Sequence, residues 1–147
     1  MRIMFVCHGN ICRSVLAEML FKHYDINKEF IVSSCATSRE EIGNPIYPPI
    51  KTELEKHNIN IEPHVARQMT YLDYLNNDYI IAMDYQNINN IKRIIGSDTE
   101  NKIYLLKHFI GLEEEVFDPW YTREFAKCYQ EIDTCVKKLY NFLKERK

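Results

Sequence analysis

Two residues near the start of the chain, Cys7 and Arg13, have the types and the spacing needed to hold and attack a phosphate group. They bound the run Cys7-His8-Gly9-Asn10-Ile11-Cys12-Arg13, which Ser14 follows. A cysteine thiolate is a strong nucleophile, and the planar guanidinium of an arginine can hold two phosphate oxygens at once. A cysteine and an arginine at this spacing also occur by chance at the end of a buried strand, so the interpretation depends on the elements around them.

Those elements are expected to form an anion site. The run Ile3-Met4-Phe5-Val6 is typical of a short buried strand, and apolar residues at helical spacing predict a helix from Ser14 onward. A loop between a strand and a helix can turn its backbone N–H groups inward, at the positive end of the helix dipole. This field would hold Cys7 as a thiolate. We expect a phosphate to be bound by the loop and the first helical turn, through His8, Gly9, Asn10, Ile11, Cys12 and Ser14.

The rest of the chain alternates strands with helices. Further strands are expected at residues 30–34, 79–83 and 103–106, and helices around 54–57, 70–75, 88–95 and 125–143. This order predicts an α/β fold, with one doubly wound domain over residues 1–147. Its four-stranded parallel sheet would be flanked by helices in a flavodoxin-like order. Ligands of such sheets bind beyond the carboxyl ends of the strands, which is where Cys7 would lie.

Composition narrows the setting. The 147 residues carry a formal net charge of -2 and contain no long block of like charge, so we expect no nucleic-acid partner. No segment is long and apolar enough for a signal peptide or a membrane span. Five cysteines, an odd number, favour reduced thiols in a cytoplasmic protein over a disulfide framework, and their spacing does not suit a metal.

The loop resembles the signature segment of the low-molecular-weight protein tyrosine phosphatases. The resemblance extends over essentially the whole chain, through Ala36-Thr37-Ser38, Ile42-Gly43-Asn44-Pro45, His64-Val65-Ala66-Arg67-Gln68, Ala82-Met83-Asp84 and Asp118-Pro119-Trp120-Tyr121. It implies hydrolysis of phosphotyrosine proteins or small aryl phosphates through a phosphocysteine intermediate. It further implies no cofactor, a monomer, and inorganic phosphate or a similar oxyanion in the loop.

The resemblance also implies a general acid. Asp118 would protonate the leaving phenolate and then act as a base toward water. Without the resemblance, Asp118 and Pro119 would be interpreted as a turn that caps the last helix. Asp84, at another strand end, is the rival acid, and we expect it to have a supporting part.

Further pocket residues follow from the same resemblance. Trp120 and Tyr121 would sandwich a phenol ring, although relatives usually have tyrosine at the first of these positions. Glu40 stands where relatives often have an aromatic residue, and with Glu41 it would make that lip acidic. We expect this lip to weaken the binding of acidic phosphopeptides.

The resemblance also implies residues that act indirectly. Ser34 and His64 would support Asn10, which we expect to adopt a left-handed conformation. Cys12 would form a disulfide with Cys7 that blocks catalysis reversibly and protects Cys7 from overoxidation. Val15 replaces the proline that relatives place after the loop serine, which should reduce local rigidity.

Three other functions remain open. Arsenate reductases share this fold and loop but need additional redox cysteines near the site, and residues 36–127 contain none. Bacterial protein arginine phosphatases tend to have threonine where this loop has Ile11, whose bulk suits a phenol edge better than a guanidinium. A phosphotyrosine-binding module without catalysis would be signalled by loss of Cys7 or Asp118, and both are present.

Overall fold

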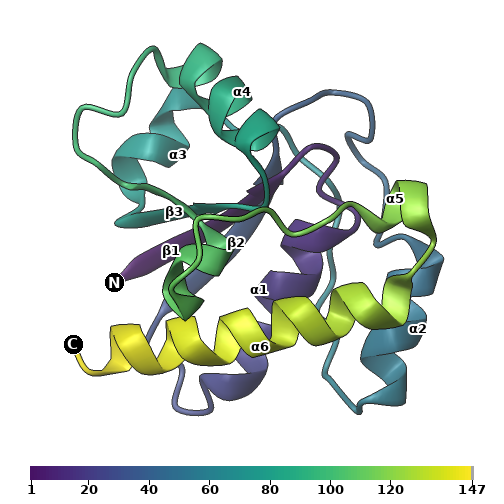
Figure 1. The fold of residues 1–147 in the computed structure, drawn as a ribbon. Coiled ribbons are helices and arrows are strands. Elements are labelled where there is room, and N and C mark those ends of the chain that lie inside the picture. Colours follow the sequence, from purple (N-terminus) through teal and green to yellow (C-terminus); the bar gives the residue numbers. More distant parts are fainter. Residues whose placement is uncertain (147) are drawn as a thin grey trace.

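The computed structural model describes residues 1–146, which are built around one parallel β-sheet. Its four strands are β1 (Arg2–Cys7), β2 (Ile31–Ala36), β3 (Tyr79–Ala82) and β4 (Ile103–Leu105). The strand order is β2-β1-β3-β4, and all neighbouring pairs are parallel. The predicted α/β fold with a flavodoxin-like order is confirmed (Figure 1).

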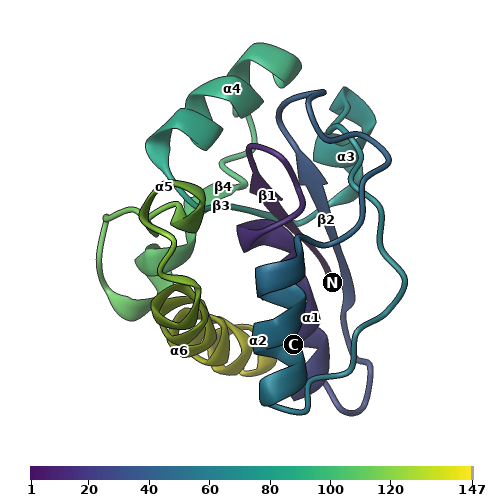
Figure 2. The ribbon, with the colours of Figure 1, turned by 90° about the vertical axis from the view of Figure 1, so that its right-hand side faces the viewer.

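Helices cover both faces of this sheet. One face carries α1 (Arg13–Tyr24), α2 (Pro48–Lys56), the 3-10 helix η1 (Leu106–Ile110) and α6 (Phe125–Lys144). The other face carries α3 (Tyr71–Asn76) and α4 (Tyr85–Ile95), as the two perpendicular views show (Figures 1 and 2). The short helix α5 (Pro119–Thr122) lies beyond the carboxyl ends of the strands, beside the loop that joins β1 to α1.

Strand β1 contributes to two hydrophobic cores because its side chains alternate between the faces of the sheet. Ile3 and Phe5 pack in the core shared with α1 and α6, whereas Met4 and Val6 pack in the core shared with α3 and α4. Burial on both faces explains why the strand is apolar from Ile3 onward. Cys7 is the last residue of this strand, so a central, rigid element positions it.

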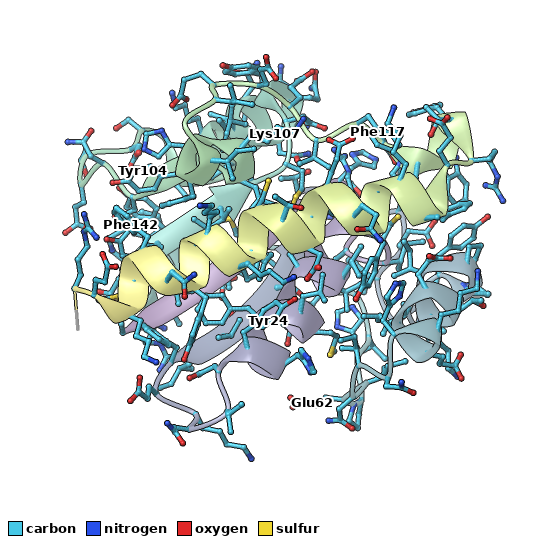
Figure 3. All side chains as sticks on the ribbon, turned by 60° about the horizontal axis from the view of Figure 1, so that its bottom comes forward. Tyr24, Glu62, Tyr104, Lys107, Phe117 and Phe142 are labelled. Atoms are coloured by element: carbon cyan, nitrogen blue, oxygen red, sulfur yellow. The ribbon has the colours of Figure 1, made fainter. Side chains whose placement is uncertain are left out.

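Helix α6 runs along the sheet and ties several elements together (Figure 3). Phe142 packs edge-on against Phe109 of η1, with ring centroids 5.4 Å apart. Lys107, also on η1, forms an ion pair with Glu131 at 2.8 Å. The buried face of this helix consists of Cys128, Tyr129, Ile132, Cys135, Val136, Leu139 and Leu143. Within residues 1–146, no helix combines the length and the apolar content needed to cross a bilayer.

The helix starts follow capping chemistry. At α3, which corresponds to the predicted helix around residues 70–75, Thr70 and Asp73 form a capping box, with the Asp73 carboxylate accepting from the Thr70 amide at 2.8 Å. At α4, the carboxylate of Asp84 accepts from the amide of Asn87 at 2.7 Å. Asp84 thereby fixes the backbone directly after β3, next to the end of β1.

Candidate active site

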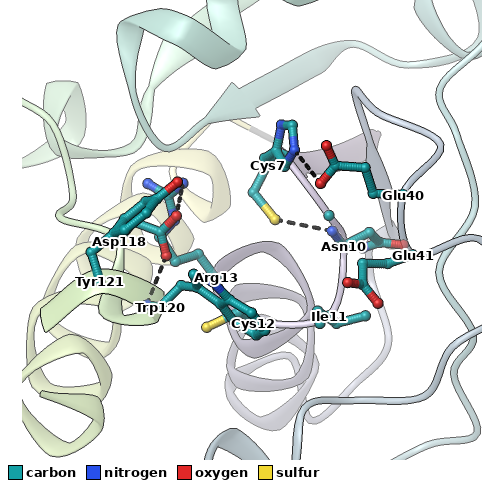
Figure 4. Close-up of a pocket in the computed structure, with 12 residues that line it drawn as sticks. Cys7, Asn10, Ile11, Cys12, Arg13, Glu40, Glu41, Asp118, Trp120 and Tyr121 are labelled. Atoms are coloured by element: carbon teal, nitrogen blue, oxygen red, sulfur yellow. Dashed lines mark hydrogen bonds and ion pairs between the residues drawn. The ribbon is translucent and has the colours of Figure 1, made fainter. Parts of the chain in front are cut away.

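A pocket of about 390 Å³ opens at the carboxyl end of β1 (Figure 4). The loop of residues 8–12 forms one wall together with the first residue of α1, and Glu40 and Glu41 form a second. Asp118, Trp120 and Tyr121 stand on the opposite side. Loop residues expected to bind phosphate line this pocket, namely His8, Gly9, Asn10, Ile11 and Cys12, whereas Ser14 lies buried behind it.

The sulfur of Cys7 lies among hydrogen-bond donors. Its Sγ is 3.0 Å from the Oγ of Ser14 and 3.3 Å from the backbone N of Asn10, which donates to it. The side-chain amide of Asn10 donates to the same Ser14 oxygen at 2.9 Å. Because that bond uses the oxygen as an acceptor, the Ser14 hydroxyl proton is free to point at the sulfur. A backbone N–H donor and a hydroxyl within hydrogen-bond distance of one sulfur are an arrangement that suits a thiolate.

Asn10 is the centre of the network behind the loop. It is fully buried and has a φ of 60°, the left-handed conformation that the sequence predicted. Its side-chain amide donates to the Oγ of Ser34 at 2.9 Å, and its backbone carbonyl oxygen is 2.8 Å from the Nε2 of His64. The backbone N–H of Arg67 donates to its side-chain oxygen at 3.3 Å. These contacts hold a strained conformation that an isolated loop would leave.

The network continues to a residue that sequence reasoning missed. Ser34 donates to Glu18 at 2.5 Å, and the other oxygen of this carboxylate pairs with Lys22 at 2.6 Å. Glu18 is buried on α1, where a charged residue requires such partners. The available sequence signal was the spacing of four between Glu18 and Lys22, which normally indicates only an exposed helix pair.

Arg13 is held by three groups around its guanidinium, which is only 3% exposed. One Nη donates to the carbonyl of Val116 at 2.8 Å. The other is 3.0 Å from Asp84 and 3.7 Å from Asp118. Burial opposes the positive charge, but the charges of Cys7, Asp84 and Asp118 outweigh it and raise the pKa of Arg13. The arginine therefore stays charged, as a phosphate ligand must.

The carboxylate of Asp118 lies between the Trp120 amide and the guanidinium of Arg13. One oxygen accepts from the Trp120 amide at 3.0 Å, and the other faces the guanidinium. This makes Asp118 the N-cap of α5, with Pro119 in the first turn, and not of α6, which begins at Phe125. The turn that the residues alone suggested is therefore present, but it starts a separate four-residue helix.

The aromatic side of the pocket has a support that the sequence did not reveal. The ring of Trp120 lies 4.9 Å from that of Tyr47, measured between centroids. The guanidinium of Arg123, at the end of α5, lies 5.6 Å from the same tyrosine ring. Trp120 is 47% exposed and Tyr121 is 82% exposed, so both present ring surface to solvent at the pocket mouth.

Cys12 lies in the wall of the pocket as a buried free thiol. Burial, with the nearby sulfurs of Cys128 and Cys7, raises the pKa of Cys12 well above its usual value. The remaining cysteines, Cys35, Cys128 and Cys135, are also buried and free. Among the described residues, no three histidine, cysteine or acidic side chains are grouped as in a metal site.

The fold and the site together define an α/β protein with a cysteine–arginine anion loop at the carboxyl edge of its parallel sheet. Residues 2–147 match the sequence profile of the low molecular weight phosphotyrosine protein phosphatases, and the chain belongs to this family of hydrolases. The family member of that name from Gallus gallus is 36% identical over 144 residues, covering 92% of this chain and 90% of the relative.

Solved structures agree with this assignment. YfkJ from Bacillus subtilis superposes with a TM-score of 0.93 at 31% identity, covering 100% of this chain and 96% of that chain. The YwlE arginine phosphatase, solved with a phosphorylated active-site serine, gives a TM-score of 0.88 at 27% identity, covering 98% of this chain and 96% of that chain. The family resemblance is thus confirmed, and it includes proteins with different phosphorylated substrates.

Proposed function

We propose that this chain hydrolyses phosphotyrosine through a phosphocysteine intermediate. The single observation that carries the proposal is the environment of Cys7. Its sulfur accepts a hydrogen bond from the backbone N–H of Asn10 at 3.3 Å and lies 3.0 Å from the Oγ of Ser14. A sulfur anion in that position faces the pocket that Arg13 and Asp118 also line. Nucleophile, phosphate ligand and acid therefore share one cavity.

The reaction has two displacement steps. In the first, the Cys7 thiolate attacks phosphorus, an S–P bond forms, and the P–O bond to tyrosine breaks as Asp118 gives its proton to the leaving oxygen. Arg13 balances the charge on the phosphoryl oxygens. In the second, Asp118 takes a proton from water, which attacks phosphorus and breaks the S–P bond. Orthophosphate leaves, and Cys7 returns to its thiolate form.

Phosphotyrosine is favoured over phosphoarginine by the side chains around the phosphate loop. Ile11 presents an aliphatic wall, and Trp120 and Tyr121 present aromatic surface at the mouth. Apolar and aromatic surfaces suit a phenol ring and do not satisfy the N–H donors of a guanidinium. Phosphoarginine is the second candidate, because the related YwlE is an arginine phosphatase.

Hydrolysis of para-nitrophenyl phosphate by four proteins tests the mechanism. Cys7→Ser should show no turnover, because a serine hydroxyl at this site is not ionised at neutral pH. Asp118→Asn should lower kcat, and the loss should be larger for phenyl phosphate, whose poorer leaving group needs the proton more. Cys135→Ala removes a buried thiol on α6 outside the site and should keep wild-type turnover. Equal activity of wild type and Cys7→Ser would overturn the proposal.

Parallel assays with phosphotyrosine, phosphoarginine and arsenate separate the substrates. Only phosphotyrosine should be turned over efficiently. Preferred hydrolysis of phosphoarginine would replace phosphotyrosine as the substrate while leaving the mechanism intact. Stoichiometric binding of phosphotyrosine without release of phosphate would indicate a binding module instead.

The proposal includes the setting in which the site works. Residues 1–147 act as one catalytic domain, as a monomer in the cytoplasm, without a cofactor. Cys7 must be a free thiol for catalysis, and all five cysteines are free, which suits a reducing compartment. Cys12 would serve as the partner that forms a reversible disulfide with an oxidised Cys7.

A further inference from the structure

The side of the pocket that faces the aromatic residues carries two carboxylates, which we call the acidic rim: Glu40 and Glu41 (Figure 4). They follow β2 and project toward the pocket mouth, opposite Trp120 and Tyr121. The side chain of Glu40 is 69% exposed. A substrate whose phosphorylated ring enters between the two sides must pass its neighbouring residues over this rim.

The acidic rim is fixed to the phosphate loop. Ser38 donates twice to the carbonyl oxygen of His8, from its backbone N at 3.1 Å and from its hydroxyl at 2.9 Å. Glu41 packs so closely on Gly9 that a Cβ at this glycine would lie 3.3 Å from the Glu41 Cγ. Its carboxylate accepts from the side-chain amide of Asn44 at 2.6 Å. The two negative charges are therefore held in place before a substrate arrives, which lowers the cost of binding to them.

No strong cation neutralises the acidic rim. Glu40 lies 2.9 Å from the imidazole of His8, and within residues 1–146 neither rim carboxylate forms an ion pair with a lysine or an arginine. Arg39 instead donates to Gln68, and Arg123 lies over the rings of Tyr47 and Phe125.

The charged residues deeper in the pocket do not neutralise the acidic rim either. Arg13 is buried at the floor, where Asp84 and Asp118 already surround it. Among the described residues, the two rim carboxylates are therefore paired only with an imidazole and a neutral amide, His8 at Glu40 and Asn44 at Glu41.

Resting on the proposed function, we propose that the acidic rim recognises a lysine or arginine side chain next to the phosphorylated tyrosine. The preferred substrates are then phosphotyrosine segments with basic flanks. This goes beyond weaker binding of acidic peptides, because it proposes that Glu40 and Glu41 directly contact a basic side chain of the substrate. Each exposed charge contact contributes modestly, so two of them predict a preference of about tenfold in kcat/KM over a matched acidic peptide.

Three peptides of one core sequence test this inference, with arginine, glutamine or glutamate on both sides of the phosphotyrosine. We expect kcat/KM to fall in that order, and the spread to shrink as ionic strength rises from about 0.02 M to about 0.5 M, because salt screens exposed charges. Glu40→Gln should reduce the arginine-to-glutamate ratio roughly threefold, and Glu40→Gln with Glu41→Gln should bring it near one. Using a ratio within each protein cancels any general change in activity. Glu55→Gln, an exposed carboxylate on α2 outside the pocket, is the matched control and should keep the wild-type ratio.

The outcomes distinguish this inference from the proposed function. Equal kcat/KM for all three peptides, or a preference for the acidic one, overturns the role of the acidic rim while phosphatase activity stands. A basic preference that survives in the double variant also overturns it, because the recognition then lies elsewhere. Absence of turnover with every peptide and with para-nitrophenyl phosphate would instead sink the proposed function.

Discussion

The side-chain amide of Asn10 donates to the hydroxyl oxygen of Ser14 at 2.9 Å, and that oxygen lies 3.0 Å from the sulfur of Cys7. We infer that the Ser14 hydroxyl, whose oxygen already accepts from Asn10, donates to a Cys7 thiolate. Asn10 thereby contacts the surroundings of Cys7 twice, through its side chain on Ser14 and through its backbone N–H on the sulfur itself. The same residue has a left-handed backbone, so its two contributions need separate tests.

Asn10→Gly separates the amide from the backbone conformation. Glycine adopts a φ of 60° without strain, so the loop keeps its path while the hydrogen bonds to Ser14 and Ser34 are lost. We expect kcat for para-nitrophenyl phosphate to fall about tenfold, which corresponds to about 1.4 kcal/mol of activation free energy. The rate of Cys7 alkylation by iodoacetate at pH 7 should also fall, because the sulfur loses the support of the Ser14 hydroxyl. An unchanged alkylation rate would show that Ser14 needs no help from Asn10.

Asp84→Asn tests the pairing of the phosphate-binding arginine. Asparagine still caps a helix, so α4 should keep its start while the 3.0 Å ion pair with Arg13 is lost. The guanidinium should then move toward Asp118, which lies 3.7 Å away, and draw the acid from its working position. We expect kcat to fall roughly three- to tenfold, a loss of about 1 kcal/mol that suits one charged hydrogen bond. Circular dichroism should show unchanged helix content, and an unaltered kcat would mean that Val116 alone positions Arg13.

Cys12→Ala tests protection against oxidation. Peroxide would convert the Cys7 thiolate to a sulfenic acid, and the Cys12 sulfur would attack it, forming an S–S bond and releasing water. Wild-type activity should return after dithiothreitol, whereas Cys12→Ala should lose activity permanently because its sulfenic acid is oxidised further.

The rate of that disulfide step should depend on pH. Because burial raises the pKa of Cys12, little thiolate is present near neutrality, and the rate should rise about tenfold per pH unit below that pKa. Mass spectrometry of the Cys7–Cys12 peptide after timed oxidation measures this. A pH-independent rate, or full recovery of the variant, contradicts the assignment.

Asp73→Asn tests how much the ion pair between Asp73 and Arg67 contributes to the stability of the fold. Asp73 accepts two bonds from the Arg67 guanidinium, at 2.9 and 3.0 Å, and caps α3. Burial opposes its negative charge, but the bonds from Arg67 and Thr70 outweigh it, and the pKa of Asp73 is below its ordinary value of 3.8. Because the pKa of the Asp73 carboxyl is lower in the folded than in the unfolded chain, its charge stabilises the fold at pH values above the unfolded pKa. This stabilisation is lost as the pH falls through the folded pKa.

At pH 7 the variant should therefore lose about 1 kcal/mol in the free energy of unfolding, as for a partly exposed ion pair with two hydrogen bonds. The difference from wild type should narrow below about pH 4, where the unfolded carboxyl begins to bind protons. Urea denaturation at pH 7, 4 and 2.5 measures it. A difference that stays constant across this range means that the charge of Asp73 contributes nothing.

Much of the fold was predictable because local signals agreed with the global arrangement. The apolar run before Cys7 and the helical pattern after Ser14 belong to neighbouring elements, so sequence alone placed the loop between a strand and a helix. Thr70 and Asp73 lie three residues apart and cap their own helix. Such features depend on contacts within a few residues, which a sequence displays directly.

The parts of the site that escaped prediction depend on contacts between distant segments. Glu18 appeared as one member of an ordinary helix pair, and only the packing of β2 on α1 brings Ser34 to its other oxygen. Tyr47 lies far in sequence from Trp120, so nothing local indicated their contact. Val116 contributes only its backbone carbonyl to Arg13, and a backbone group has no residue type that a pattern could reveal.

The carboxylate of Asp118, the N-cap of α5, accepts a hydrogen bond from the amide of Trp120 in that helix. The proposed proton donor and one side of the proposed ring-binding slot therefore belong to the same short segment. Widening the slot for a bulkier aryl group by tilting that segment would also turn the donor away from the leaving oxygen. Among variants selected for new substrates, fit and turnover should consequently change together, unless the adaptation occurs on the opposite, carboxylate-bearing side.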